Sequence, residues 1–466
     1  MWFLDMTFRS GDRRIPSQVL VPTLCIVFSK FLNWLVFPIP TIHPDTATYA
    51  PKEWLSFELV SFSGDAVRGW PLPLIYAIVP SPSLQVLFQL AFSAFAWICL
   101  LFAVQSLFPN RISSWFFSMA ITALAITPFG TQWDTVLLGT SIMLSSNLLI
   151  ISVILHIWKK PGSQYTHLVL FVLLDAFIFL QKSSNLPLCL LYAAIVFLSP
   201  LRTVGKLRKV SLLLLFSLVM SYGALVGNNV DKKWDFSYSG TTLLWQLGSQ
   251  SPSSTSFKEF LQNQDSVPKC VYHRAPYRDI NSEIVAILSD CPEAGNYVRD
   301  KLKLDFAKFL IGNPDEAVKL IAVSAGAVST ASSSNYGKSV SIFPRTVDRL
   351  FFGETSPSLR SQGVSNQEKG LSAVFSGDPI WIYAPPIGWI LLGLFSGLVI
   401  LRCRESSQAN TYLLVNLILI SSLVQFSISS VLLPSEWVRQ SSPYVFPILT
   451  LLALNVAIFL GLKTKK

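Results

Sequence analysis

The residues best suited to chemistry gather in one polar stretch, 39–82, which follows the first long apolar segment of the chain. Asp45 and Tyr49 stand near the start of this stretch, and Arg68 stands near its end. A carboxylate can take a proton from a hydroxyl group, and a cation can neutralise a phosphate. We therefore expect any chemistry of this protein at this loop, on a substrate such as a phosphorylated sugar.

Further polar residues interrupt or border the apolar segments. A charge at the middle of a bilayer costs about 2.5–3.5 kcal/mol on insertion scales, so each such residue is expected to have a partner, water or a function. Asp175 and Lys182, seven positions apart, would face one side of a helix. With alternating spans, all but the first of the following groups would share the membrane face of Asp45. The groups are Lys30 with Asn33; Gln132, Trp133 and Asp134; Asp175, Lys182 and Asn185; and Glu436 with Arg439.

Structural roles compete with each functional interpretation. Aromatic residues near the ends of membrane spans usually anchor the interface, which would account for Trp133 and Trp437. Lys182 can extend its amino group toward the membrane surface, and Lys30 can do the same or pair within the bundle. Asp45 can simply cap its loop. A functional site is favoured by the convergence of acids, cations and aromatic rings at one face.

The composition identifies the elements that must position these residues. Half of the 466 residues (51%) are hydrophobic, only 13% are charged, and the mean hydropathy is +0.50. Soluble domains carry about 25% charged residues. The net charge of +10 comes mostly from short basic runs between apolar segments, a pattern typical of membrane topology. The chain is therefore expected to be an all-α polytopic membrane protein, and no nucleic-acid partner is expected.

Apolar segments of spanning length, about 20 residues each, divide the chain into two bundle parts and an insert. We expect about ten transmembrane helices. Seven lie in a first part, 1–228, which also carries the loop 39–82, and three lie in the last part, 379–466. The predicted spans are 18–38, 83–108, 113–129, 135–157, 165–182, 184–200, 210–228, 380–401, 411–433 and 443–462.

Basic residues in short loops predict the orientation, because such residues are retained in the cytoplasm. They collect at every second connection and at the C-terminus, and Arg9, Arg13 and Arg14 precede a first span that has no cleavage site behind it. The sequence thus predicts a multi-pass protein of the cell inner (plasma) membrane with both termini cytoplasmic. The loop 39–82 and the insert would then be extracytoplasmic.

The insert, 229–378, is polar and too long for a plain loop, so it predicts an extracytoplasmic domain. Asn313 followed by Pro314 indicates a helix start, with Asn313 as the N-cap. The helix 314–331 would lie on the membrane surface or pack within the domain; composition leaves both open. Cys270 and Cys291, the two cysteines in this polar region, predict a disulfide worth up to about 3 kcal/mol, with two free thiols as the alternative.

Short motifs carry a resemblance to a known superfamily. They are Pro44-Asp45-Thr-Ala-Thr-Tyr49, Arg68-Gly-Trp70-Pro71-Leu-Pro73, Leu137-Leu-Gly-Thr-Ser141, Phe179-Leu-Gln-Lys182-Ser-Ser-Asn185 and Glu436-Trp-Val-Arg439. Together they resemble integral-membrane glycosyltransferases of the GT-C superfamily, in particular bacterial cell-envelope members of the arabinofuranosyltransferase type.

The resemblance implies transfer of a sugar from a polyprenyl-phosphate donor to a glycan or glycolipid acceptor. Asp45 would be the general base, and Lys182 and Arg439 would hold the phosphate of the lipid donor. Tyr49, Arg68, Asn185 and Glu436 would contribute to substrate binding, as would Asp134, which stands where relatives often carry a glutamate. Some relatives bind a divalent metal near these acids, so a metal ion is a possible cofactor here.

Other classes of protein remain open at this point. A transporter or flippase would place charged or broken helices at the membrane midplane, in repeat-related positions. A lipid-linked oligosaccharide polymerase or ligase would favour an arginine-containing extracytoplasmic loop, and the insert carries Arg274, Arg278, Arg345 and Arg349. An assembly protein would need no convergent acids and bases.

Overall fold

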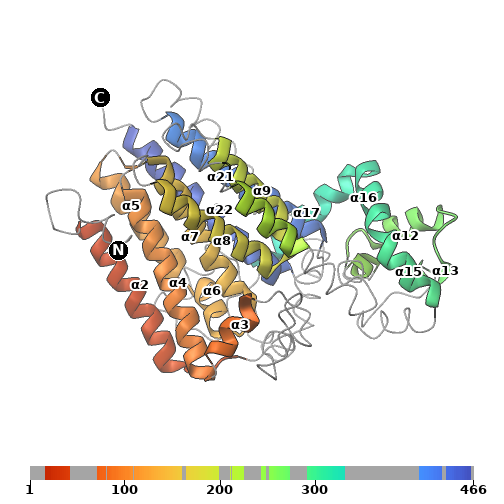
Figure 1. Ribbon diagram of the computed structural model, residues 1–466, viewed down its shortest axis with the longest axis horizontal. Coiled ribbons are helices and arrows are strands. Elements are labelled where there is room, and N and C mark those ends of the chain that lie inside the picture. Colours follow the sequence, from red (N-terminus) through yellow and green to blue (C-terminus); the bar gives the residue numbers. More distant parts are fainter. Residues whose placement is uncertain are drawn as a thin grey trace.

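The computed structural model describes residues 16–41, 71–79, 81–105, 107–108, 110–159, 164–198, 210, 213–224, 243–247, 251–272, 291–330, 409–432 and 437–462. Within these ranges the chain is helical and forms no β-strand; one isolated parallel bridge joins Thr41 to Val136. Most helices run side by side in a bundle, and a smaller helical unit lies beside it (Figure 1). The all-α class is therefore confirmed for the described part of the chain.

The bundle is built from the apolar segments. Its helices are α2 (Ser17–Val36), α4 (Pro82–Gln105), α5 (Arg111–Ile126), α7 (Gly139–Lys159), α8 (Gln164–Gln181), α9 (Leu186–Leu198), α21 (Ala409–Leu432) and α22 (Trp437–Leu462), with the short helices α3 (Pro71–Ile78) and α6 (Pro128–Thr131) at one end.

Five helices in the described ranges are long and apolar enough to cross a membrane: α2, α4, α7, α21 and α22. Four more apolar helices have only 10–17 residues: 111–126, 165–181, 186–197 and 213–224. Nine of the ten predicted spans thus coincide with apolar helices, and the tenth, 380–401, lies outside the described residues. The structure supports a membrane protein, whereas the number of spans stays a prediction.

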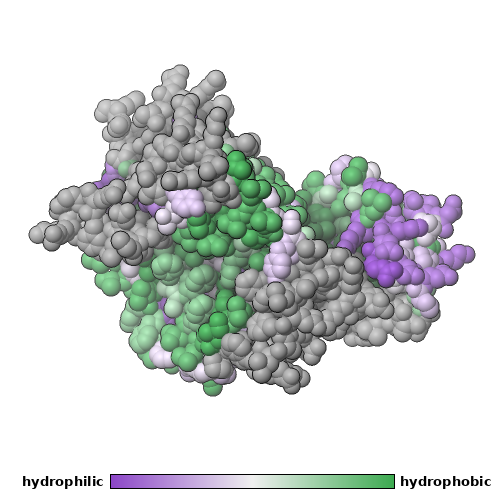
Figure 2. All heavy atoms as spheres, viewed as in Figure 1, coloured by the Kyte–Doolittle hydropathy of each residue, from purple (hydrophilic) through white to green (hydrophobic). Residues whose placement is uncertain are grey.

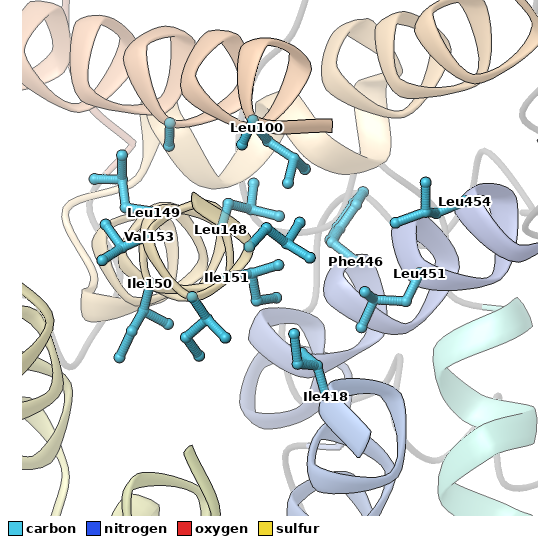
Figure 3. Packing of buried hydrophobic residues seen from close by; sticks show 14 of the residues in the cluster. Leu100, Leu148, Leu149, Ile150, Ile151, Val153, Ile418, Phe446, Leu451 and Leu454 are labelled. Carbon is cyan, nitrogen blue, oxygen red and sulfur yellow. The ribbon is translucent and has the colours of Figure 1, made fainter. Parts of the chain in front are cut away.

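The core of the bundle surrounds α7, whose membrane-length segment is buried throughout. Leu148 and Ile151 of α7 meet Leu100 of α4 on one side and Phe446 of α22 on the other (Figure 3). Aliphatic side chains from four helices interdigitate here, and Trp97 packs edge-on against Phe446, with ring centroids 6.2 Å apart. This packing fixes the central helices against which the polar residues described below are held.

Helix ends follow local sequence signals. α2 ends at Val36, directly before the Phe37-Pro38 pair, because proline cannot continue the helix. α5 begins after Asn110, whose side-chain oxygen accepts a hydrogen bond from the Ser113 main-chain N–H (2.8 Å). After α5, Pro128 opens α6 and the chain continues into the 3-10 turn η2 (Gln132–Thr135).

The smaller unit is formed by residues of the predicted insert. Phe257, Phe306 and Phe309 form its aromatic centre, with ring centroids 5.0–6.1 Å apart. A disulfide joins Cys270 to Cys291, whose Cα atoms are 6.5 Å apart. The elements of the unit are η5 (Trp245–Leu247), α12 (Ser254–Gln262), α13 (Lys269–Tyr272), α15 (Pro292–Asp300) and α16 (Leu302–Gly312). We call this set, 243–312, the second helical unit.

Helix α17 (Pro314–Thr330) connects the second helical unit to the bundle. Leu320 lies in the core of the unit, whereas Ser324 accepts a hydrogen bond from Ser430 of α21 (2.8 Å). Packing within the protein thus holds one face of this helix. α17 starts at Pro314 as predicted, but Asn313 does not cap it: the Asn313 side-chain amide donates to the carbonyl of Phe309 (2.8 Å) and so closes the end of α16 instead.

Candidate functional site

A buried ion pair lies at one end of the bundle. Lys30 Nζ of α2 is 2.5 Å from Asp134 Oδ2 of η2, and both residues are 2% exposed. The second carboxylate oxygen, Oδ1, accepts a hydrogen bond from Ser141 Oγ in the first turn of α7 (2.5 Å). Both oxygens of Asp134 are therefore occupied by protein groups, and the pair joins α2, η2 and α7 at one point.

The main chain around Asp134 is held by Gln89 of α4. Its side-chain amide donates to the carbonyl oxygens of Asp134 (3.1 Å) and Val136 (3.0 Å). The side-chain oxygen of Gln89, Oε1, accepts from the hydroxyl of Tyr76 in α3 (3.0 Å), and the same hydroxyl lies 3.4 Å from the main-chain carbonyl of Leu138. The segment 134–138, which we call the Asp134 turn, is thus bonded to α4 and to α3.

The Asp134 turn also holds the chain that leaves α2. The main-chain N–H of Thr41 donates to the carbonyl of Thr135 (2.8 Å), and Thr41 forms the isolated bridge with Val136. Thr41 and Tyr76 both lie within the predicted loop 39–82, on either side of its segment 42–70. Both ends of the segment 42–70 are therefore fastened to the same turn. Asp45, Tyr49 and Arg68 lie within this segment, outside the described residues.

A second polar connection joins α8, α21 and α22. The Tyr444 hydroxyl of α22 donates to Asn185 Oδ1, and the Asn185 amide donates to the Ile178 carbonyl (3.1 Å). The Gln425 amide of α21 donates to the carbonyl of Ser184 (2.9 Å). Asn185 is fully buried, and both its side-chain oxygen and its side-chain nitrogen make hydrogen bonds. Its side chain therefore holds the turn after α8 in place.

This connection places two predicted basic positions at the same end of the bundle. Lys182 is half-buried and directly follows α8, and its carbonyl accepts from the main-chain N–H of Asn185 (2.9 Å). Arg439 lies in the first turn of α22, five residues before Tyr444, or about 7.5 Å along the helix axis. Glu436 lies outside the described residues.

The turn after α8, which contains Asn185, and the Asp134 turn both lie against the start of α7. The Asn185 amide is 3.1 Å from the sulfur of Met143, which is two residues beyond the Ser141 that bonds Asp134. The structure therefore brings together Asp134, Asn185 and Lys182, which are separated in sequence, at the start of α7. The helix that carries Arg439 also reaches this point through Tyr444.

Asp175 and Lys182 lie on either side of the end of α8, and their sharing of one face stays a prediction. Asp175 is fully buried in α8, and neither of its carboxylate oxygens has a hydrogen-bond partner in the described part of the chain. Lys182 is half-buried beyond the end of the helix. The prediction extended the helix through Lys182, but α8 ends at Gln181 and the chain turns there into the 3-10 turn η4 (Ser183–Asn185).

Sequence reasoning missed the partner of Lys30 and the role of Gln89. The two charges lie 104 positions apart, and no local spacing links them. The sequence did contain a signal for Gln89, because a glutamine inside an apolar segment is costly to bury unless its side chain is hydrogen-bonded. Among the described residues no group of three or more His, Cys, Asp or Glu side chains is arranged to hold a metal ion.

The site thus contains a buried acid, Asp134, whose two carboxylate oxygens are bonded by protein groups, in a turn to which both Thr41 and Tyr76 are attached. The contacts of Asp134 to Lys30 and Ser141 can hold the surrounding helix ends and the attachment of Thr41 in fixed positions. Comparison of the chain with protein-family models, with curated proteins and with solved structures returned no match.

Proposed function

We propose that this protein is a membrane glycosyltransferase that moves a sugar from a polyprenyl-phosphate donor to a glycan or glycolipid acceptor. The reaction would take place at the end of the bundle that carries the Asp134 turn. Asp45 acts as the general base, and Lys182 and Arg439 bind the phosphate of the donor. The sequence resemblance to the GT-C superfamily supplies the substrate class, and the geometry supports a reaction site at this end of the bundle.

One observation carries the proposal: both ends of the loop that contains Asp45 are fastened to the Asp134 turn. Asp45 follows Thr41 by four residues, which reach at most about 14 Å in extended chain. The Thr41 bond to Thr135 therefore limits how far the Asp45 backbone can lie from the Asp134 turn, which supports a site at this end of the bundle. A base and cations held at one membrane face meet the positional requirement of the reaction.

The chemistry is a single displacement. Asp45 takes the proton of an acceptor hydroxyl, and the resulting oxygen attacks the anomeric carbon of the sugar. The bond from that carbon to the phosphate oxygen breaks, and the polyprenyl phosphate leaves with the electron pair. Lys182 and Arg439 neutralise the charge that develops on the phosphate. The proton on Asp45 is then released to water.

Asp134 takes a positioning role in this scheme. Because Lys30 and Ser141 occupy both of its carboxylate oxygens, we infer that it acts on substrate through the loop and helix ends that it holds. A structural acid of this kind is expected to influence turnover through geometry, whereas the removal of Asp45 would remove the proton acceptor itself.

The direct test is an assay of the purified protein in detergent with a panel of radiolabelled polyprenyl-phosphate sugars and a mixed glycan or glycolipid acceptor. We expect transfer with at least one donor. Asp45→Asn should reduce turnover by about 10²–10⁴-fold while donor binding persists. Activity of this variant within a few-fold of the wild type, in monodisperse protein with a normal melting temperature, would contradict the role of Asp45.

Matched variants separate a general effect of charge from the proposed roles. Asp65→Asn removes another acid of the same loop and should retain activity. Lys182→Ala and Arg439→Ala should weaken donor binding and slow turnover, whereas Lys159→Ala removes a cation from the opposite end of α7 and should do neither.

A membrane transporter or flippase is the second candidate. The observation in its favour is the presence of ionisable groups inside the bundle: the Lys30–Asp134 pair and the fully buried Asp175. Intramembrane acids often mark ion or proton pathways. Absence of transfer from every donor, together with movement of a lipid-linked sugar across the membrane of liposomes that contain the protein, would favour this function over the transferase.

A further inference from the structure

Exposed apolar side chains lie on α16 of the second helical unit and on the following helix α17, and we call them the apolar strip. Leu304 and Ile311 of α16 are 59% and 82% exposed, and Val318 of α17 is 65% exposed. Leu304 and Ile311 lie seven residues apart, which places them on one face of α16. The opposite face carries Phe306 and Phe309, which pack in the core of the unit. This helix therefore has one buried apolar face and one exposed apolar face.

Lysines border the strip. Lys303 and Lys308 of α16 are exposed, as is Lys319 of α17. Lys308 forms an ion pair with Asp305 (3.1 Å), and Lys319 forms one with Glu316 (3.5 Å), each one helical turn away. Both lysine side chains remain about half exposed in these pairs. Exposed apolar side chains with lysines beside them are typical of helices that lie in a membrane interface, where the amino groups reach the phosphate groups of the lipids.

The second helical unit contacts the end of a membrane-length helix, α21, whose exposed face is apolar. On α21, Leu413, Leu417, Ile420 and Val424 are 38–54% exposed and follow one another at intervals of four, three and four residues. Seven residues beyond Val424 on the same face is Val431, which packs against the core of the second helical unit. The Val431 carbonyl accepts a hydrogen bond from Gln246 of η5 (2.6 Å). The unit therefore sits at the end of the exposed stripe of a membrane-length helix.

The surface view agrees with this placement. Figure 2 shows hydrophobic residues over α16 and α17, on the side of the unit next to the bundle, and hydrophilic residues over the far end around α12, α13 and α15. From this geometry we propose that Leu304, Ile311 and Val318 insert into the headgroup and acyl boundary of one lipid leaflet. The second helical unit then rests on the bilayer with its polar end in water.

Spin labels on single cysteines test this inference in the full-length protein, reconstituted in nanodiscs of phosphatidylcholine and phosphatidylglycerol. The background has alanine in place of Cys25, Cys99, Cys189 and Cys403 and keeps the disulfide. Ile311→Cys is compared with Glu293→Cys, an exposed position in α15. Collisions with oxygen, which concentrates in lipid, and with a water-soluble nickel complex are measured for each label.

We expect the ratio of oxygen to nickel collisions to be several-fold higher at position 311 than at position 293. Equal ratios would overturn the inference, because the strip would then face water. Shielding of position 311 from both reagents would also overturn it, since another part of the chain or a second copy would then cover the strip. Val318→Cys gives an independent reading and is expected to follow position 311.

Discussion

Lys30 and Asp134 form a buried ion pair across 104 residues of sequence, with 2.5 Å between Nζ and Oδ2. The pair ties α2 to the turn that also receives Thr41 and Gln89. A charge that is buried in this way is costly once its partner is removed, whereas an exposed pair contributes little. The Lys30–Asp134 pair is therefore the strongest single test of the architecture at this end of the bundle.

Lys30→Ala leaves the carboxylate of Asp134 buried with only Ser141 as a donor. We expect the free energy of unfolding, measured by denaturation in detergent, to fall by about 3–5 kcal/mol. Arg299→Ala, which removes the exposed pair with Asp300, should cost no more than about 1 kcal/mol. The double variant Lys30→Met/Asp134→Asn removes both charges and should recover part of the loss. Equal effects of the buried and exposed changes would contradict the ion pair.

Sequence periodicity located most helices because apolar runs must form helices inside a membrane. The first span was predicted at 18–38 and lies at 17–36, since Pro38 cannot continue the helix and the bond from the Phe37 N–H to the Asn33 carbonyl is its last. The last span was predicted to start at Pro443, but α22 begins at Trp437 and carries Pro443 and Pro447 inside it. Tertiary contacts such as that of Tyr444 with Asn185 hold this helix past its prolines.

The candidate site was less predictable than the helices. Local spacing could suggest Asp134, Lys182 and Asn185 as site residues. It could not show that Lys30 forms an ion pair with Asp134 or that the Tyr444 hydroxyl donates a hydrogen bond to Asn185. Such partners are set by how distant helices pack, and a single sequence contains no periodic signal for them. The same reason explains why local spacing could not show that the carboxylate oxygens of Asp175 are buried without a hydrogen-bond partner in the described residues.

Thr41→Pro tests the attachment of the loop to the Asp134 turn. Proline removes the N–H that donates to the Thr135 carbonyl, so a carbonyl at the base of the loop loses its partner. We expect a loss of about 1–3 kcal/mol in stability and faster tryptic cleavage at Lys52. Thr41→Ala keeps the main-chain bond and deletes a buried hydroxyl that has no partner in the described residues, so it should behave as the wild type. Similar cleavage rates in the two variants would refute the attachment.

Gly130 and Gly295 predict opposite effects of the same substitution. A Cβ atom at Gly130 would lie 2.7 Å from the main-chain oxygen of Leu124, which cannot move without disturbing α5, whereas one at Gly295 would meet nothing within 4 Å. Gly130→Ala should destabilise the protein by about 1–3 kcal/mol. Gly295→Ala, in the middle of α15, should stabilise it by about 0.5–1 kcal/mol because alanine loses less backbone entropy. A stabilising Gly130→Ala would show that the turn before η2 is packed differently.

Glu316 gives the attachment of α17 a defined pH dependence. Burial raises the pKa of its carboxyl group, but hydrogen bonds from Ser253 and Ser256 (both 2.8 Å) and the nearby Lys319 outweigh this effect, so the pKa is lowered overall. A carboxyl group whose pKa is lower in the folded protein than in the unfolded chain stabilises the fold above its unfolded value, near 4.5, and this contribution is lost as the pH falls through the folded value. Melting curves of the wild type should therefore shift to lower temperature below about pH 4.5, and Glu316→Gln should show a smaller shift. Asp315→Asn removes the same charge from the neighbouring exposed position and should keep the wild-type response. An unchanged pH response in Glu316→Gln would mean that the bonds to Ser253 and Ser256 do not hold α17 to the second helical unit.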